Sequence, residues 1–200
     1  MLLRKTVISD FPKICDLVVK SFLKHEPMCN VLKIQDYDFI YSFENLLKEC
    51  CQSGLSSVIV ENNNNLIATS LACTYNSYEK IKIPELKSSE INKIISILDD
   101  LNSKKINDKD MSVYHFIVGT DPNYINRGLS KLVINETIKL SSINGNYKYI
   151  IADATNIVSQ HILQNHYSYK PYTHIKYSDY DYFKEITDTE YIIRMIKDIY

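Results

Sequence analysis

Hydrophobic positions along the chain follow two different periods, which predicts that strands and helices alternate. Runs of β-branched and aromatic residues bounded by turn residues predict strands, and apolar positions three or four residues apart predict amphipathic helices. The expected strands cover residues 2–8, 55–60, 66–74, 111–118, 149–154, 170–177 and 190–196. The expected helices cover residues 11–22, 36–53, 85–101, 128–142 and 157–165. We therefore expect an α/β fold.

Turn and capping residues mark the ends of several of these elements. Ser9-Asp10 offers an N-cap to the first helix, and Pro12 lies in its first turn, where a missing amide donor is harmless. Gly54 ends the second helix in the C′ position. The asparagines of 62–65 form the turn of a hairpin, and Ser89 is the expected cap of the helix that follows.

The most informative stretch is residues 111–130, MSVYHFIVGTDPNYINRGLS, which contains a strand, a turn and the start of a helix. Pro122 breaks the strand because proline has no amide to donate to a neighbouring strand. The turn leaves backbone amides unpaired at the positive end of the next helix, and such amides bind phosphate. Gly128 permits close approach of a ligand to the backbone, and Arg127 adds a positive charge.

Two interpretations of this stretch are open on local grounds, a phosphate site or a strand–turn–helix unit that binds nothing. The spacing is neither that of a Walker loop nor that of a dinucleotide fingerprint, because the required lysine and further glycines are missing. The strands at 111–118 and 149–154 are expected to pair in parallel, with a turn at 145–148 before the second. The helix between them is expected to bury Leu129, Leu132, Val133 and Ile138, and the helix at 157–165 is expected to bury Val158, Ile162 and Leu163.

Composition restricts the classes of function. Two hundred residues suit one domain, 1–200, and 45% apolar with 24% charged residues is ordinary for a globular protein. A net charge of −1 gives no reason to expect a nucleic-acid or membrane partner. We also expect neither a signal peptide nor a membrane span.

The cysteines and histidines point away from disulfides and metals. The five cysteines have no Cys-x-x-Cys spacing, which favours free thiols in a reducing compartment and hence a cytoplasmic location. The five histidines show no ligand spacing, so we expect no metal site. His115, on the central strand, is either a substrate contact or a hydrogen-bonded core residue, and we expect the second.

Residues 122–130 resemble a known cofactor signature. Pro122-x-Tyr124-x-x-Arg127-Gly128-Leu129-Ser130 is similar to the acetyl-CoA signature of the GNAT superfamily of N-acetyltransferases, Arg/Gln-x-x-Gly-x-Gly/Ala after a Pro-x-Tyr turn. Ile125 stands where the family usually has Arg or Gln. This departure removes one side chain and leaves the amides, which hold the pyrophosphate in the family.

The resemblance implies a GNAT-like mixed sheet of six or seven strands flanked by about four helices, with acetyl-CoA as the cosubstrate. A backbone amide near Val118 or Thr120, on a bulged central strand, would then stabilise the oxyanion of the reaction. The cofactor-binding residues that the resemblance implies are Val118, Thr120, Ile125, Asn126, Arg127, Gly128, Leu129, Ser130 and Asn156.

Glu26 is the candidate general base. Pro27 restricts Glu26 to an extended conformation on the loop after the first helix. Most glutamates are solvated loop or surface acids, which is the plain alternative. Phe22-x-x-x-Glu26-Pro27, however, resembles the Phe…Asp-Glu-Pro stretch of the arylalkylamine N-acetyltransferase branch, in which the glutamate is the base. Here His25 replaces the aspartate, and a carboxylate can remove the proton that an alkylamine carries at neutral pH.

The general acid is left open between three residues. Asn156 and Ser159 match the family's Asn-x-x-Ser/Ala-x-x-Leu segment, which packs beside the pantetheine and its thiol. The family ends this helix with Gly-Phe or Gly-Tyr, whereas residues 166–169 read His-Tyr-Ser-Tyr. Ser168-Tyr169 aligns with that pair unless the match shifts by one residue. Ser159, Tyr167 and Tyr169 are therefore all candidates to protonate the leaving thiolate.

Three functional hypotheses follow. The first is acetyl transfer from acetyl-CoA to the primary amine of a small molecule, with arylalkylamines or polyamines favoured, by a monomer or homodimer. The second keeps this fold and changes the acceptor to a protein amine, an amino sugar or an antibiotic. The third is a CoA-binding module without transferase activity. The helix at 85–101 either lines the acceptor pocket, as in the resembled branch, or only covers an edge strand.

Overall fold

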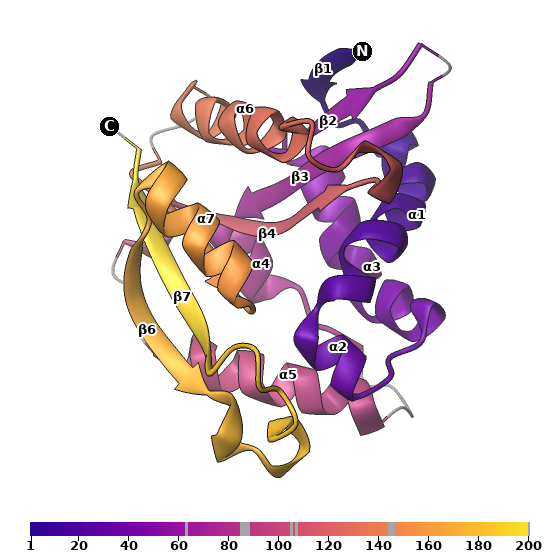
Figure 1. Cartoon of the computed structure of the whole chain (residues 1–200). Coiled ribbons are helices and arrows are strands. Elements are labelled where there is room, and N and C mark those ends of the chain that lie inside the picture. Colours follow the sequence, from indigo (N-terminus) through magenta and orange to yellow (C-terminus); the bar gives the residue numbers. More distant parts are fainter. Residues whose placement is uncertain (63, 85–88, 105, 107, 144–146, 200) are drawn as a thin grey trace.

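Seven strands form one sheet in the computed structural model, which describes residues 1–62, 64–84, 89–104, 106, 108–143 and 147–199. The strand order is β1-β2-β3-β4-β5-β7-β6 (Figure 1). Only β4 and β5 pair in parallel, as their crossover helix predicts, and the other neighbours are antiparallel. The strands are β1 Leu2–Lys5, β2 Ser57–Val60, β3 Leu66–Thr74, β4 Ser112–Thr120, β5 Tyr149–Ala154, β6 Lys170–Lys176 and β7 Tyr191–Asp198. This arrangement confirms the predicted mixed α/β sheet.

Helices cover both faces of the sheet. They are α1 Phe11–Ser21, α2 Pro27–Val31, α3 Asp36–Gln52, α4 Tyr75–Lys80, α5 Ser89–Asn102, α6 Leu129–Ile143 and α7 Ile157–Tyr167. The short helices α2 and α4 were not predicted, because five or six residues are too few to show a helical period. Within the described residues, no helix combines the length and the apolar character needed to cross a bilayer.

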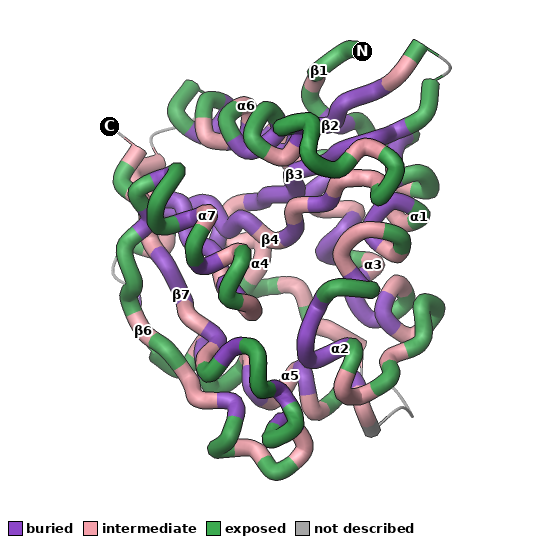
Figure 2. Tube along the Cα trace, viewed as in Figure 1, coloured by how far each residue is buried: buried purple, intermediate pink, exposed green. Residues whose placement is uncertain are grey.

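Buried residues run along the strands (Figure 2), and those on opposite faces of the sheet belong to different hydrophobic cores. On β5, Ile151 packs with residues of α1, α3 and α5, whereas Ile150 and Ala152 pack with residues of α6 and α7. The same division holds on β7, where Ile192 belongs to the first core and Met195 to the second. Side chains at positions 151 and 153 of β5 therefore face the α3 and α5 side of the sheet.

Several predicted details are corrected by the structure. The first strand ends at Lys5 rather than Ile8, and 3-10 turn residues follow it. Asp10 occupies the N-cap position of α1 but makes no capping bond, because Arg4 holds its carboxylate with two hydrogen bonds of 2.7 and 2.8 Å. Leu132 and Val158 were expected to be buried and are 48% and 62% exposed. The predicted start of a helix at 85–88, the side-chain cap by Ser89 and residues 145–146 of the predicted turn lie outside the described residues.

The two central strands diverge along their length. The register pairs β4 with β5 from Ser112–Tyr149 to His115–Ala152, and no further pair is formed although β4 continues to Thr120. On the other side of β4, Ile117 lies opposite Leu71 and His115 opposite Ala72, so Phe116 is an extra residue in a β-bulge. The bulge bends β4 at the place where β5 departs. The sheet is consequently open between the C-terminal halves of β4 and β5.

Candidate active site

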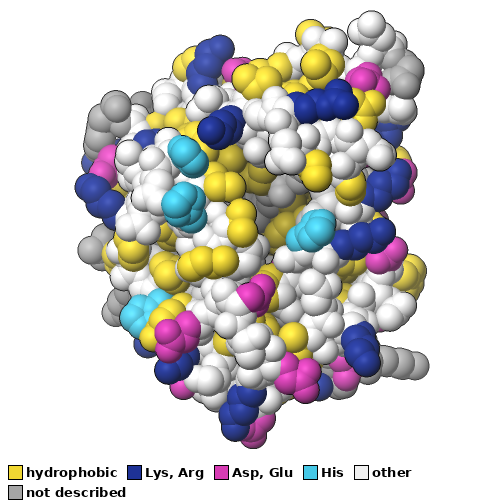
Figure 3. Space-filling model, viewed as in Figure 1, with side chains coloured by type: hydrophobic (Ala, Val, Ile, Leu, Met, Phe, Trp, Pro, Cys, Tyr) yellow, Lys and Arg dark blue, Asp and Glu magenta, His cyan; other side chains and the backbone are white. Residues whose placement is uncertain are grey.

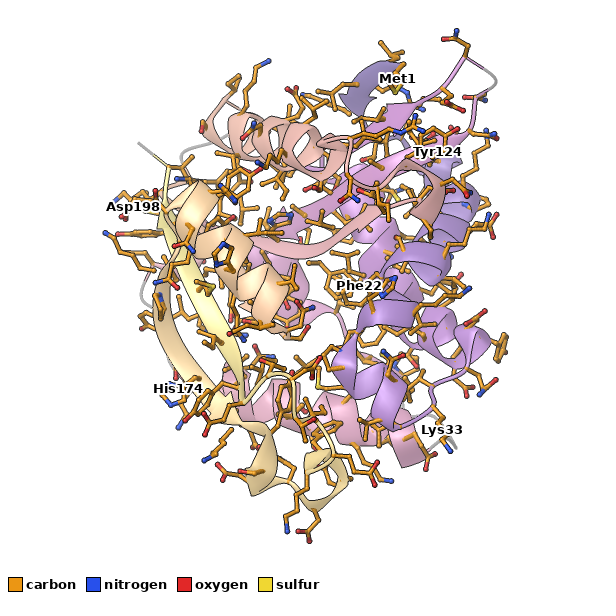
Figure 4. The ribbon with its side chains drawn as sticks, viewed as in Figure 1. Met1, Phe22, Lys33, Tyr124, His174 and Asp198 are labelled. Atoms are coloured by element: carbon orange, nitrogen blue, oxygen red, sulfur yellow. The ribbon has the colours of Figure 1, made fainter. Side chains whose placement is uncertain are left out.

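A cleft of about 270 Å³ occupies the opening between β4 and β5. Figure 3 shows the molecule hollowed near the centre of this face, with hydrophobic side chains around the hollow. Residues 115–118 and 120 of β4, residues 152–155 at the end of β5, and residues of α7 line its walls. Phe22, which directly follows α1 and is labelled in Figure 4, also lines the cleft.

The loop before α6 lies at one end of this cleft, where Ser130 contributes to the lining. Gly128 has a φ of +71° and Asn126 a φ of +61°, a left-handed conformation that turns the chain sharply into the helix. No described group accepts a hydrogen bond from the backbone amides of residues 125–131. A Cβ atom at Gly128 would meet no atom within 4 Å, so the space above the loop is open. These amides therefore fit a diphosphate.

The predicted cofactor residues fall into two groups. Val118, Thr120, Ser130 and Asn156 line the cleft. Ile125, Asn126, Arg127 and Gly128 are exposed on the loop, and Leu129 is buried beneath it. Because the side chain of Ile125 is 58% exposed, that position offers its backbone amide rather than a packed side chain.

Asn156 organises the other wall of the cleft. Its Oδ1 accepts a hydrogen bond from the backbone amide of Ser159 at 2.8 Å and caps α7, as the sequence predicts. The Ser159 hydroxyl donates to the carbonyl of Asn156 at 2.9 Å, and Ser159 lines the cleft. Thus Ser159 is within the candidate site, and protonation of a thiolate requires its hydroxyl to rotate away from that carbonyl.

Tyr167 and Tyr169 are both buried and lie outside the residues that line the cleft. The Tyr167 hydroxyl donates to the Lys131 carbonyl at 3.3 Å, and burial raises its pKa. The Tyr169 hydroxyl is buried without a hydrogen-bond partner among the described residues. Of the three candidate acids, the structure brings only Ser159 to the cleft.

Glu26 is buried rather than solvated, with 3% of its surface exposed. It adopts the extended conformation expected before proline, with φ −81° and ψ 119°, and forms the N-cap of α2. Its Oε2 accepts a hydrogen bond from the Cys29 amide at 2.7 Å, whereas Oε1 has no hydrogen-bond partner among the described residues. Burial raises the pKa of this carboxyl, and the Cys29 amide and the Thr155 side chain partly counteract it.

Glu26 lines a small chamber of about 60 Å³ next to the cleft. The chamber and the cleft share walls made by Phe22, Phe116, Asp153 and Thr155. On its other side the chamber shares Phe43, Leu98, Tyr114 and Phe116 with a pocket of about 500 Å³. This acceptor pocket, as we call it, lies between α3, α4, α5 and β4 and also includes Tyr78, Glu79 and Asp99.

Buried charge on the sheet accompanies this chamber. Asp153 and Arg194 face each other across β5 and β7 and form two hydrogen bonds of 2.7 Å. Asp153 lines both the cleft and the chamber, and Arg194 is fully buried. Neither residue was singled out from the sequence. The available signal was an arginine inside the apolar run YIIRMI of β7, because a buried charge requires a partner.

Three solved structures share this architecture over nearly the whole chain. Arylalkylamine N-acetyltransferase 2 from Aedes aegypti superposes with a TM-score of 0.79 at 17% identity, over 100% of this chain and 99% of that one. The C-terminal condensation domain of Ebony, solved with beta-alanyl-dopamine, gives 0.81 at 16% identity over 98% of each chain. Polyamine N-acetyltransferase from Drosophila melanogaster gives 0.75 at 12% identity, over 98% of this chain and 99% of that one.

The chain has the GNAT fold. No family model matches its sequence. The fold implied by the resemblance at residues 122–130 is therefore confirmed by three-dimensional similarity. In this GNAT fold the cleft between β4 and β5 reaches the loop at 125–131 through Ser130 and shares walls with the chamber that Glu26 lines.

His115 is a buried, hydrogen-bonded residue of this GNAT fold, as predicted, and it also contributes to the wall of the cleft. It is 4% exposed, and its Nε2 shares a hydrogen bond of 2.8 Å with the Ser70 hydroxyl on β3. Burial lowers the pKa of the imidazole to about 4. At neutral pH it is therefore uncharged, and its bond to Ser70 helps to hold β3 and β4 together next to the bulge.

Proposed function

We propose that this chain is an N-acetyltransferase that moves an acetyl group from acetyl-CoA to the primary amine of a small molecule. One arrangement carries the proposal: a cleft in the sheet has at one end backbone amides without an acceptor among the described residues, and it shares walls with a chamber lined by the buried carboxylate of Glu26. The first feature suits a diphosphate, and the second suits removal of a proton. The GNAT fold and its N-acetyltransferase neighbours support this assignment.

Glu26 is the proposed general base. Acetyl-CoA supplies the acetyl group as an activated thioester, and an alkylamine can attack it only after losing the proton it carries at neutral pH. Oε1 of Glu26 is available for that proton because Oε2 alone is held by the Cys29 amide. The raised pKa brings the carboxyl closer to neutrality, where a general base works best.

The oxyanion and the leaving group need their own partners. Val118 and Thr120 of the bulged strand line the cleft, and a backbone amide near one of them is the proposed oxyanion donor. Ser159 is the preferred proton donor to the leaving thiolate because it lines the same cleft. Tyr167 is the weaker alternative, since its hydroxyl bonds to the Lys131 carbonyl on the side of α6.

The acceptor pocket favours an amine that carries an aromatic ring or a second positive charge. Its walls combine the rings of Phe43, Tyr78, Tyr114 and Phe116 with the acid Asp99. Glu79 also lines the pocket but is paired with Lys109, and Lys82 adds one positive charge. Aromatic faces attract rings and cations, and carboxylates attract ammonium groups. Arylalkylamines and polyamines meet these requirements.

The five free cysteines favour a reducing compartment such as the cytoplasm.

The test has two stages on the purified chain. Acetyl-CoA should raise the melting temperature in a thermal-shift measurement, because binding to the native state alone stabilises it. Thiol release should then be assayed with tyramine, putrescine, glucosamine and a peptide with a free N-terminus. Turnover with tyramine or putrescine above the other two supports the proposal. Turnover confined to glucosamine or the peptide would reassign the acceptor, and a thermal shift without thiol release would indicate a CoA-binding module.

A further inference from the structure

The guanidinium of Arg194 uses all its donors inside the protein. Nε and Nη2 each donate to Asp153 at 2.7 Å, and Nη2 also donates to Asn102 Oδ1 at 2.7 Å. Nη1 donates to the Tyr75 hydroxyl at 3.2 Å and to the Leu101 carbonyl at 3.3 Å. Five hydrogen bonds thus match the five N–H groups of an arginine. The side chain is fixed in one orientation although it is completely buried.

Two of these partners, Asp153 and Asn102, are also hydrogen-bonded to a pair of tyrosines. The Tyr114 hydroxyl donates to Oδ2 of Asp153 at 3.1 Å. Asn102, whose oxygen accepts from Arg194, donates through Nδ2 to the Tyr78 hydroxyl at 3.0 Å. The rings of Tyr78 and Tyr114 are stacked, with centroids 3.9 Å apart and an interplanar angle of 19°. Two chains of hydrogen bonds, which we call branches, therefore begin at Arg194. One runs through Asp153 to Tyr114, the other runs through Asn102 to Tyr78, and the two tyrosine rings are stacked on each other.

The stacked pair lies at the acceptor end of the candidate site. Tyr114 lines both the chamber beside Glu26 and the acceptor pocket, and Tyr78 lines the acceptor pocket. Neither ring lines the cleft assigned to the cofactor. A change in the orientation of these rings would therefore alter the surface offered to the amine and leave the diphosphate loop unchanged.

We propose that Arg194 is a positioning residue that fixes the Tyr78–Tyr114 stack as a binding wall for the amine acceptor. This role rests on the proposed function, since it assumes that an amine occupies the acceptor pocket. Arg194 touches no substrate and acts through Asp153 and Asn102. The planar guanidinium explains why arginine suits this position. A lysine ammonium has three donors on a single nitrogen atom and cannot bond to Asp153 and Asn102 in this geometry.

Arg194→Lys is the central test because it keeps the positive charge opposite Asp153. With acetyl-CoA saturating, we expect the KM for tyramine to rise about tenfold, the effect of losing one well-placed aromatic contact. The KM for ethylamine, which has no group to place against the rings, should stay within about twofold. The dissociation constant of acetyl-CoA, measured by titration calorimetry, should also stay unchanged. Lys176, the last residue of β6, forms an exposed ion pair with Glu190. Lys176→Met removes this ion pair and is the matched control.

Asn102→Ala and Tyr114→Phe test the branches singly and serve if Arg194→Lys does not fold. Each should raise the KM for tyramine. In the double variant Asn102→Ala with Arg194→Lys, the KM should rise by less than the product of the two single increases, because both substitutions disrupt the branch through Asn102. A purely structural role predicts instead a lower kcat for every amine with each KM unchanged, and that result would overturn the proposal. Wild-type protein that releases no thiol with any amine would overturn the proposed function itself.

Discussion

The Glu26 carboxylate and the Cys29 amide are joined by a 2.7 Å hydrogen bond, so the candidate base is also the N-cap of α2. The bond holds one carboxylate oxygen and directs the negative charge towards the N-terminus of a helix. The other oxygen, Oε1, has no hydrogen-bond partner among the described residues, and Glu26 lines the chamber. One side chain therefore has a structural and a proposed chemical role, which different substitutions can separate.

Glu26→Gln should abolish the chemical role and keep the cap. The glutamine oxygen can still accept from the Cys29 amide, whereas the amide group cannot take a proton from the substrate. We expect kcat to fall about 10²- to 10⁴-fold, the usual contribution of a general base. Affinity for acetyl-CoA and the melting temperature should change little. Thiol-release kinetics, titration calorimetry and thermal unfolding measure the three quantities.

Glu26→Ala is the companion variant. It loses the cap as well, so it should also lower the free energy of unfolding by about 1 kcal/mol. If the glutamine variant turns over as fast as the wild type, Glu26 is not the base.

The pH dependence of kcat/KM should report the ionisation of Glu26. Burial raises the pKa of its carboxyl above the ordinary 4.5, and only the ionised form accepts a proton. The rate should therefore be low at acidic pH and rise as pH increases through that raised pKa. The limb should be absent from the residual activity of Glu26→Gln. A limb that persists in this variant would assign the ionisation to another group.

Gly128 and Gly54 form a natural pair for testing the diphosphate loop. Their φ values are +71° and +72°, and a Cβ atom at either would meet nothing within 4 Å. Alanine at each position should therefore cost a similar backbone strain, about 1–2 kcal/mol of stability. Only Gly128→Ala should also weaken acetyl-CoA binding, by about tenfold, because it reorients the amides around the ligand. Equal affinities in the two variants would place the diphosphate elsewhere.

His115 should make the folded state sensitive to acid. Its folded pKa of about 4 lies below the unfolded value of 6.5, so the unfolded chain binds the proton more tightly. The stabilisation is complete above pH 6.5 and is lost as pH falls towards 4, by about 3 kcal/mol in total. Denaturant unfolding between pH 4 and 7 should show a shallower loss in His115→Gln. His166→Gln, at an exposed position of α7, should behave as the wild type.

Much of the fold could be predicted because its signals are local. The bounds of β3 and β5 match the prediction, since each is an unbroken run of strand-forming residues between turn signals. Leu132 and Val158 were misplaced because an apolar residue at helical spacing was taken to face the core. Val158 instead lines the open cleft. The spacing of apolar residues along a helix does not distinguish a side chain that faces the core from one that faces a cleft.

The candidate site divides in the same way. The loop at 125–131 and the Asn156 cap were found because a few consecutive residues specify them. The network around Arg194 was missed because its partners lie far away in the chain, from Asp153 at 41 residues to Tyr75 at 119. Neither periodicity nor a short motif reports such distances, and only the buried position of the arginine gives a hint.

The divergence of β4 from β5 has one more consequence. At the loop before α6, the cleft it creates offers main-chain amides, which every amino acid except proline supplies. A side chain there can differ from the resembled signature, as Ile125 does from its Arg or Gln, and the amide remains. Three solved structures that are only 12–17% identical to this chain share its architecture, so very different side chains are compatible with this backbone.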